Sequence, residues 1–351
     1  MIKILLSTGG TGGHIFPILS LNKELKKNEN IKDVKIITDK RAKKFIDFDD
    51  FKIINVDSPF RKKGVIHLIK TFFYIFYSTF RCFLIIIFFN PKIVIGSGGY
   101  VSFPVLLACI LLRKKFILYE TNAVLGRVNR LFLPYCFKLL SGYPDIRGLP
   151  HKYLKKFNHV GQLVRDKFLQ ISNEIVDTNS SKINDKVLNI LILGGSQGAK
   201  VLGEKLPKCF KSLDEKKIKL SIKQQVQKNQ LEVIRKFYNN NIKSHAFLFE
   251  FNKNIENYII EADIIICRSG SSTIAELSIL NKPFIAIPLP GSLDNHQYFN
   301  AKYFHDKDCC WLLDENTDDF EHKIITILKD IYNSDDLLND KKNNLTRLNK
   351  K

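Results

Sequence analysis

Residues 264 to 276 read Ile-Ile-Ile-Cys-Arg-Ser-Gly-Ser-Ser-Thr-Ile-Ala-Glu. An apolar run that passes into small hydroxylated residues and then into a helical pattern predicts a strand, a tight turn and a helix. The first amides of such a helix lack partners within it and lie at the positive end of its dipole, which favours an anion such as phosphate. An ordinary capped helix would show the same residues, because Ser and Thr are common N-caps. The choice between the two interpretations depends on the rest of the chain.

The composition predicts a cytoplasmic globular protein with an unusual charge. The chain has 351 residues, enough for two domains, and a formal net charge of +20. Such a charge suits nucleic acid, an anionic membrane or phosphorylated substrates. Lysine is spread along the chain without the basic arm or aromatic platform of nucleic-acid binders, so no nucleic-acid partner is expected. The seven irregularly spaced cysteines predict neither disulfides nor a metal site, and the apolar run at residues 4–6 is too short for a signal peptide.

Three other turns between a predicted strand and a predicted helix are rich in glycine. They read Ser-Thr-Gly-Gly-Thr-Gly-Gly-His at residues 7–14, Gly-Ser-Gly-Gly-Tyr at 96–100 and Gly-Gly-Ser-Gln-Gly at 194–198. Glycine lets the backbone approach a ligand closely. Doubly wound sheets bind ligands at the strand ends where such turns lie. The first turn lacks dinucleotide-site spacing, and we expect no acidic residue at the usual place after a second strand.

Two domains and a tail are predicted. Both halves begin with a strand, a glycine turn and a helix, which predicts an α/β protein of two Rossmann-like, doubly wound parallel sheets facing each other across a cleft. The composition turns polar after residue 165, so we place one domain at residues 1–160 and a second at 161–330. Residues 331–351 are charged and rich in asparagine, and we expect a helix that returns toward the first domain and fades into disorder.

Polar side chains at these turns are candidates for catalysis and binding. His14 is the titratable side chain of the first glycine turn; its imidazole could accept the proton of an attacking hydroxyl, or the ring could only pack there. Glu120 and Asn122 follow a predicted strand at residues 116–119, either as ligand contacts or as a capping turn. The amide of Gln297, beside a predicted helix start, offers a donor and an acceptor to sugar hydroxyls.

The segment between Gly64 and Asn90 is crowded with Phe, Tyr, Ile and Leu. When it is wound as a helix, its polar residues fall within one stripe and leave an apolar face wider than a core contact needs. We do not expect a transmembrane helix, because Lys70 and Arg81 interrupt the apolar run. A basic amphipathic helix lying on an anionic membrane surface fits better, with an internal core helix as the alternative. The stripe consists of Lys63, His67, Lys70, Thr71, Tyr74, Ser78 and Arg81.

Six motifs follow one another along about residues 1–320: Gly-Gly-Thr-Gly-Gly-His, Gly-Ser-Gly-Gly-Tyr-Val-Ser, Glu-Thr-Asn, Gly-Gly-Ser-Gln-Gly, Arg-Ser-Gly-x-x-Thr-x-x-Glu and His-Gln. Their order and distances resemble the MurG family of N-acetylglucosaminyltransferases, in glycosyltransferase family 28. The resemblance implies the GT-B fold, with the donor UDP-N-acetylglucosamine (UDP-GlcNAc) on the second domain and the acceptor on the first. It also implies that lipid I, undecaprenyl-pyrophosphoryl-MurNAc-pentapeptide, is converted to lipid II for peptidoglycan, by a peripheral protein on the cytoplasmic side of the inner membrane.

The resemblance also implies a set of donor contacts, in which Glu276 holds the ribose hydroxyls and Gln297 the donor sugar. Two departures stand out: Tyr119 occupies a position where the family has His, and Lys223 and Gln224, in Lys-Gln-Gln-Val, replace a His-Gln-x-Gly turn and are weaker candidates. The implied donor-binding set is Thr11, Gly12, Gly13, Asn122, Arg165, Ser196, Asn252, Ser271, Ser272, Thr273, Ile274, Ala275, Glu276 and Gln297.

The expected reaction is an inverting glycosyl transfer without a metal or cofactor. The C4 hydroxyl of the muramyl sugar would attack the anomeric carbon of the donor, while His14, or secondly Glu120, removes its proton. Backbone amides after Ser196 and Ser269 would stabilise the charge on the departing UDP. No Asp-x-Asp pair lies beside the glycine turns, which favours the metal-free route.

Other functions fit parts of the pattern. A UDP-sugar 2-epimerase, or another UDP-sugar transferase, would share the fold, but an epimerase leaves the wide apolar helix unexplained. A non-enzymatic protein that binds a membrane surface or nucleic acid would show salt-sensitive binding without UDP release. That reading leaves the glycine turns unexplained.

Overall fold

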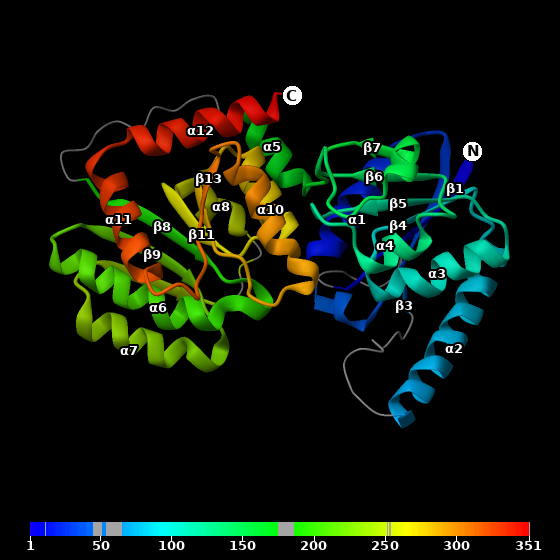
Figure 1. Ribbon diagram of the computed structural model, residues 1–351, viewed down its shortest axis with the longest axis horizontal. Helices are drawn as coiled ribbons and strands as arrows, with labels where there is room; N and C mark the ends of the chain where they lie inside the picture. Colours follow the sequence, from blue (N-terminus) through cyan, green and yellow to red (C-terminus); the bar gives the residue numbers. More distant parts are fainter. Residues whose placement is uncertain are drawn as a thin grey trace. The chain divides into compact units, whose positions relative to one another are not determined.

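The computed structural model describes residues 1–10, 12–44, 51–53, 65–174, 186–250, 252 and 254–350. Within these ranges, side chains are not described for residues 43–44, 51, 53, 65–70 and 195–199. The chain forms two compact units, Met1–Arg165 and Asp166–Lys351 (Figure 1).

The first unit is a parallel sheet in the order β3-β2-β1-β4-β5-β6-β7. Its order reverses between β1 and β4, as in doubly wound folds. The strands are β1 (Ile2–Ser7), β2 (Ile31–Thr38), β3 (Phe51–Ile53), β4 (Ile93–Gly96), β5 (Phe116–Glu120), β6 (Lys138–Ser141) and β7 (Phe157–His159). The helices are α1 (Gly12–Lys26), α2 (Val65–Phe89), α3 (Gly99–Leu111) and α4 (Arg127–Phe132), with short 3₁₀ turns η1 (Lys40–Lys44) and η2 (His151–Lys156).

The second unit repeats this plan, with the strand order β10-β9-β8-β11-β12-β13 and a reversal between β8 and β11. Its strands are β8 (Leu188–Leu193), β9 (Leu220–Gln225), β10 (His245–Phe249), β11 (Ile264–Cys267), β12 (Phe284–Ala286) and β13 (Cys310–Leu312). Its helices are α5 (Asp166–Glu174), α6 (Gly195–Glu215), α7 (Leu231–Asn241), α8 (Ile255–Glu261), α9 (Ser271–Ile279), α10 (His296–His305), α11 (Phe320–Asn333) and α12 (Asp336–Asn349), with 3₁₀ turns η3 (Lys228–Gln230) and η4 (Leu293–Asn295). The predicted pair of doubly wound parallel sheets is confirmed.

Continuous apolar strands suit these sheets because helices cover both faces. In β1, Leu5 packs with the residues of α3 on one face, whereas Ile4 and Leu6 pack with Ile18 of α1 on the other. Alternate side chains of one strand therefore enter two separate cores, and polar groups collect at the strand ends.

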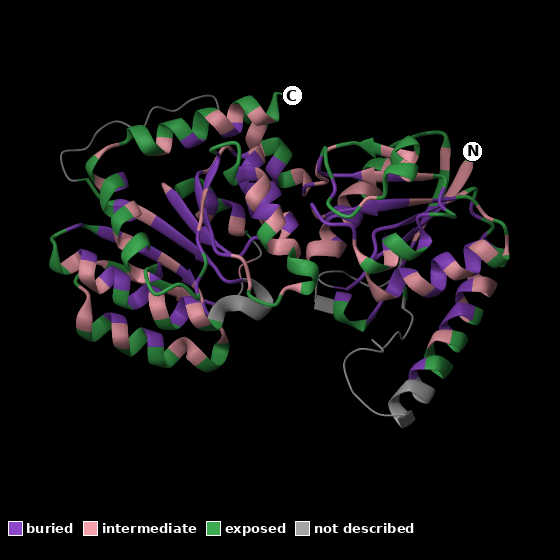
Figure 2. Cartoon of the chain, in the orientation of Figure 1, coloured by how far each residue is buried: buried purple, intermediate pink, exposed green. Residues whose placement is uncertain are grey.

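Helix α2 packs on α3 through a narrow face that includes Ser78, Cys82 and Ile86 (Figure 2). The predicted polar stripe does not form one solvent face, because Thr71 and Ser78 are buried while Tyr74 is exposed. Among the described side chains of the helix, the exposed ones are mostly aromatic, and they include Phe72, Phe73, Phe76, Tyr77, Phe80 and Phe88.

Within the described residues, Thr71–Phe89 is one helical stretch long and apolar enough to cross a membrane, and 28% of it is buried. Arg81 therefore does not shorten the run as the sequence suggested. Core helices of soluble proteins meet the same criterion, so length and composition alone do not identify a membrane span.

The tail is ordered rather than fading into disorder. Helix α12 buries Leu345 and packs on α9, and Asn349 Nδ2 donates to Ser278 O at 2.6 Å. Local composition predicted disorder because most α12 residues are polar, but these tertiary contacts stabilise the helix. The expected return of the tail toward the first unit stays a prediction.

Candidate active site

The first glycine turn connects β1 to α1 and is held by the side chains of Thr8 and Asp39. Thr8 Oγ1 donates to His14 O at 2.8 Å, and Gly10 N donates to Asp39 Oδ2 at 3.2 Å. A Cβ atom on Gly10 would lie 2.4 Å from Asp39 Oδ1 and 2.7 Å from Ala42 N. Only glycine fits there, because the turn lies directly against the end of β2. Thr11 lies outside the described residues, and Gly12 and Gly13 begin α1.

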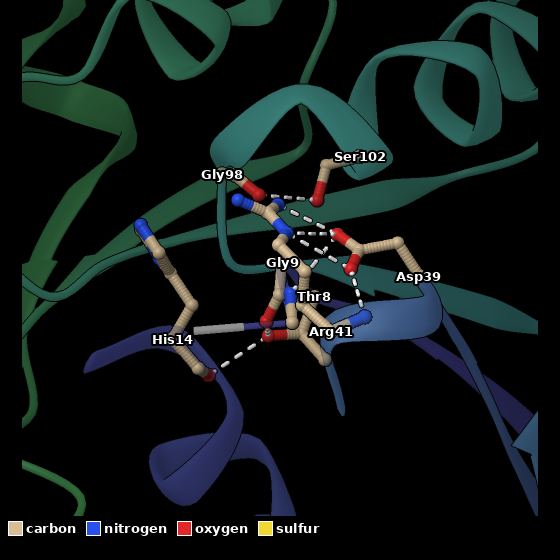
Figure 3. Close-up of polar contacts among 8 residues, drawn as sticks. Thr8, Gly9, His14, Asp39, Arg41, Gly98 and Ser102 are labelled. Atoms are coloured by element: carbon tan, nitrogen blue, oxygen red, sulfur yellow. Dashed lines mark hydrogen bonds and ion pairs between the residues drawn. The ribbon is translucent and has the colours of Figure 1, made fainter. Parts of the chain in front are cut away.

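Asp39 corrects the expectation that no acidic residue follows the second strand. It comes directly after β2, is 6% exposed, and binds the Arg41 guanidinium with Nη2 to Oδ2 at 2.6 Å (Figure 3). Burial alone would raise the pKa of Asp39, but hydrogen bonds from Arg41 and Gly10 outweigh it, and the pKa lies below its usual value. Its position just after the strand pattern of Val34, Ile36 and Ile37 was the available sequence signal.

His14 lies in the first turn of α1 and is half-buried. Its Nδ1 is 3.1 Å from Ser97 O, a distance at which Nδ1 carries the proton and donates to the carbonyl. The lone pair of the neutral ring is then on Nε2, the atom suited to accept a proton. Figure 3 shows the ring directed away from the Asp39–Arg41 pair.

The second glycine turn lies beside the first. Gly98 and Gly99 have φ of 77° and 72°, which glycine adopts without strain. A Cβ on Gly99 would be 3.7 Å from Gly9 Cα, and Ser102 Oγ donates to Gly98 O at 2.8 Å. Two glycine backbones and His14 therefore meet at the carboxyl ends of β1 and β4.

Glu120, at the end of β5, is 2% exposed and accepts hydrogen bonds from Gly126 N at 2.9 Å, Asn129 Nδ2 at 2.8 Å and Asn122 N at 3.1 Å. Burial raises the pKa of Glu120, although these donors act in the opposite direction. Glu120 holds the turn after β5, and Asn122 belongs to the same network. The side chain of Tyr119 is equally structural, since its hydroxyl accepts from Leu163 N at 3.1 Å.

Arg165 is the last residue of the first unit. Its guanidinium carbon lies 4.8 Å from the ring centroid of Phe16, on α1 two residues after His14. This cation–π contact holds Arg165 beside the first glycine turn.

In the second unit, β11 passes through Arg268-Ser-Gly into α9, as predicted. The N-cap is Gly270, and no side chain caps the helix, so the serines and threonine are not used as ordinary caps. Ser269 Oγ is buried and lacks a hydrogen-bond partner in the described part of the chain. Ser271, Ile274, Ala275 and Glu276 are buried, whereas Ser272 and Thr273 are half-buried.

The Arg268 side chain contacts the ends of neighbouring strands and stabilises the fold there. Its guanidinium forms an ion pair with Glu315 at 2.6 Å, with both side chains 6% exposed, and donates to Pro288 O at 3.1 Å. The pair joins the ends of β11, β12 and β13. Sequence reasoning missed Glu315, because nothing local connects residues 268 and 315.

The other implied donor contacts of the second unit lie at the starts of two helices and, for Asn252, between elements. Gln297 is in the first turn of α10, and its Oε1 accepts from Leu289 N at 3.0 Å. The Oδ1 of Asn252 accepts from Asn254 N at 2.8 Å. Ser196 lies in the first turn of α6, but its side chain is outside the described residues.

Comparison with known proteins identifies the family. Residues 4–141 match the glycosyltransferase family 28 N-terminal domain, and residues 189–351 match the C-terminal domain of that family. A protein of Rickettsia bellii (strain RML369-C), named UDP-N-acetylglucosamine--N-acetylmuramyl-(pentapeptide) pyrophosphoryl-undecaprenol N-acetylglucosamine transferase, is 35% identical over 99% of this chain and 96% of its own length. The relative of the same name in Pelagibacter ubique (strain HTCC1062) is 36% identical over 97% of this chain and 92% of its own.

The fold has a solved counterpart. The crystal structure of Acinetobacter baumannii MurG superposes with a TM-score of 0.76 at 24% identity, over 99% of this chain and 95% of that one. The chain therefore belongs to glycosyltransferase family 28, and within it to the family of its MurG-type relatives.

Proposed function

We propose that this chain is an N-acetylglucosaminyltransferase that transfers GlcNAc from UDP-GlcNAc to the C4 hydroxyl of MurNAc in lipid I, with inversion, and so makes lipid II for peptidoglycan. The observation that carries the proposal is the identity of 35% to a transferase of that name over almost the whole of both chains. Both glycine turns of the first unit and the open start of α9 are present in this chain.

His14 is the proposed general base. The hydrogen bond from Nδ1 to Ser97 O fixes the tautomer and ring orientation, and Nε2 then accepts the proton of the attacking hydroxyl as the new bond forms. Glu120 remains the second candidate, but four N–H donors from Asn122, Gly126 and Asn129 occupy its buried carboxylate, which favours a structural role.

The donor is proposed to bind the second unit, with additional contacts from residues 11–13, Asn122 and Arg165. The uncapped amides at the start of α9 suit the diphosphate, and Glu276, one and a half turns later, suits the ribose hydroxyls. The first turn of α6 at Ser196 supplies a second group of amides. These dipoles stabilise the charge that develops on UDP without requiring a metal.

The exposed aromatic side chains of α2 are proposed to hold the protein on the cytoplasmic face of the inner membrane. A groove of about 410 Å³ lined by Arg113, Lys114, Lys115, Tyr135 and Phe137 lies near the end of α2, because Lys114 Nζ donates to Asn90 Oδ1 at 2.6 Å. Basic and aromatic groups together suit an anionic membrane surface. No nucleic-acid partner is proposed.

The test combines purified protein, UDP-GlcNAc and a lipid I analogue in metal-free buffer. We expect UDP and a disaccharide product in equal amounts. Turnover of UDP-GlcNAc without acceptor would instead identify an epimerase, and the absence of both reactions would refute the proposal.

His14→Ala tests the base in the same assay. Loss of a general base lowers kcat by roughly 10²- to 10⁴-fold. His151→Ala, at an exposed position of η2, is the matched control and should retain wild-type turnover. Turnover of His14→Ala near the wild-type rate would remove His14 from the mechanism.

A further inference from the structure

Helix α5 contacts two segments of the second unit that carry implied donor contacts. Its residue Ser172 donates through Oγ to Ile279 O at 2.9 Å, at the end of α9. Near its other end, Lys167 Nζ donates to Asn254 Oδ1 at 3.3 Å and to Glu256 Oε1 at 2.9 Å. The helix therefore connects α9 with the segment that precedes and begins α8.

The contacts of Lys167 form a relay to Asn252. Asn254 is the N-cap residue of α8, but its side chain makes no cap hydrogen bond and instead accepts from Lys167. The backbone N–H of Asn254 donates to Asn252 Oδ1 at 2.8 Å. One lysine thus fixes the side chain of Asn254, and the backbone of Asn254 fixes the side chain of Asn252.

The Lys167–Glu256 ion pair is asymmetric. The Lys167 side chain is 62% exposed, whereas the Glu256 side chain is 7% exposed, and Glu256 Oε2 has no hydrogen-bond partner within the described residues. A buried carboxylate depends strongly on its counter-charge, because desolvation is costly. The exposed Lys167 therefore helps to fix the position of the backbone that follows Asn252, through its contacts with Asn254 and Glu256.

We infer that Lys167 is a positioning residue for donor binding, acting through Asn254 and Glu256 on Asn252. Lys167 follows Arg165 by two residues, so the same short stretch supplies one implied donor contact and orients another. The inference rests on the proposed function, since it takes UDP-GlcNAc as the donor. It predicts an effect on nucleotide binding rather than on the chemical step.

The experiment measures UDP binding by titration calorimetry and donor KM by the transfer assay. For Lys167→Met we expect about fivefold weaker UDP binding and a donor KM raised about as much, because one charge-assisted contact is lost. The kcat should stay within about twofold, since the interaction is equal in the ground and transition states. Lys167→Arg should restore most of the affinity. Lys323→Met, which breaks the exposed Lys323–Asp319 pair at 2.8 Å on α11, is the matched control and should bind like wild type.

A second variant distinguishes loss of the proposed contact from a folding defect of Lys167→Met. Asn254→Ala removes the Lys167–Asn254 hydrogen bond but keeps the backbone N–H of residue 254 and the Lys167–Glu256 pair, and should weaken UDP binding about twofold to threefold. The double variant should bind little worse than Lys167→Met alone, because both substitutions break one route. UDP affinity of Lys167→Met equal to wild type, or full additivity in the double variant, would overturn the inference. A wild-type protein that binds UDP but makes no disaccharide would refute the proposed function, while its UDP affinity would still test Lys167.

Discussion

Replacing the aromatic face of α2 should release the protein from membranes without unfolding it. Phe72, Phe76 and Phe80 recur every four residues on one face of the helix and are 67%, 66% and 53% exposed. Serine at these three positions removes apolar area that the fold itself does not bury. Surface substitutions of this kind usually change stability by less than about 0.5 kcal/mol each.

The expected magnitude follows from the exposed area. Full burial of a Phe side chain contributes about 1.5–3 kcal/mol, and more than half of each ring is available to enter the bilayer interface. Three rings together should contribute about 3 kcal/mol, which corresponds to roughly a 100-fold change in partitioning. Basic groups such as Lys115 should contribute about 1 kcal/mol each near an anionic surface, and that part should weaken with salt.

The assay is sedimentation with phosphatidylglycerol vesicles at low and high salt. The triple variant should lose most bound protein at both salts, yet keep the wild-type melting temperature and kcat/KM toward a soluble acceptor analogue. Val233→Ser, at an apolar position of α7 that is 70% exposed, is the control and should sediment like wild type. Wild-type sedimentation of the triple variant would refute the reasoning, because the three exposed rings would then contribute nothing to membrane binding.

Two further predictions concern the site itself. Glu276→Ala should raise the donor KM with little change in kcat, as expected when uniform binding is lost; an unchanged KM in the transfer assay would exclude the ribose contact. Asp39→Asn should lower the melting temperature at neutral pH, because the lowered pKa of Asp39 means that its ionised form is stabilised by the fold. That contribution is present above the unfolded pKa near 3.9 and is lost as pH falls through the lowered folded pKa, so melting curves of variant and wild type should converge in acid below that folded pKa. A difference in melting temperature that persists there would show that Asp39 acts through shape rather than charge.

The fold was predictable because its determinants are local. Apolar strands that run into glycine or serine turns repeat in both halves, and β8 ends at Leu193, directly before the predicted glycine turn at 194–198. The first and second glycine turns were also evident in the sequence. In the structure, Gly98 has a positive φ and the backbone at Gly10 lies close to its neighbours, so glycine is the residue that fits at both positions. Local pattern therefore indicated the edge of each sheet at which the glycine turns lie.

The contacts that hold this edge in place were not predictable. Asp39 binds Gly10 across 29 positions of sequence, and α12 is stabilised by an asparagine that contacts residues about 70 positions earlier. For α2, periodicity identified a polar stripe but could not show that Thr71 and Ser78 are buried. The helix is covered on one narrow face, and composition alone does not indicate which face that is.

Arg268 shows why membership of a motif is not the same as contact with a ligand. A cation next to a phosphate-binding turn suggests a phosphate contact, but the Arg268 charge is neutralised by Glu315 in a pocket where both side chains are buried. Breaking that pair would leave an uncompensated buried charge, which typically costs about 3–5 kcal/mol. The arginine therefore stabilises the strand ends from which the turn departs. In the proposed complex, attraction for the diphosphate would depend on the uncapped backbone amides at Gly270 and Ser271, where substitution of side chains alone would leave the donors in place.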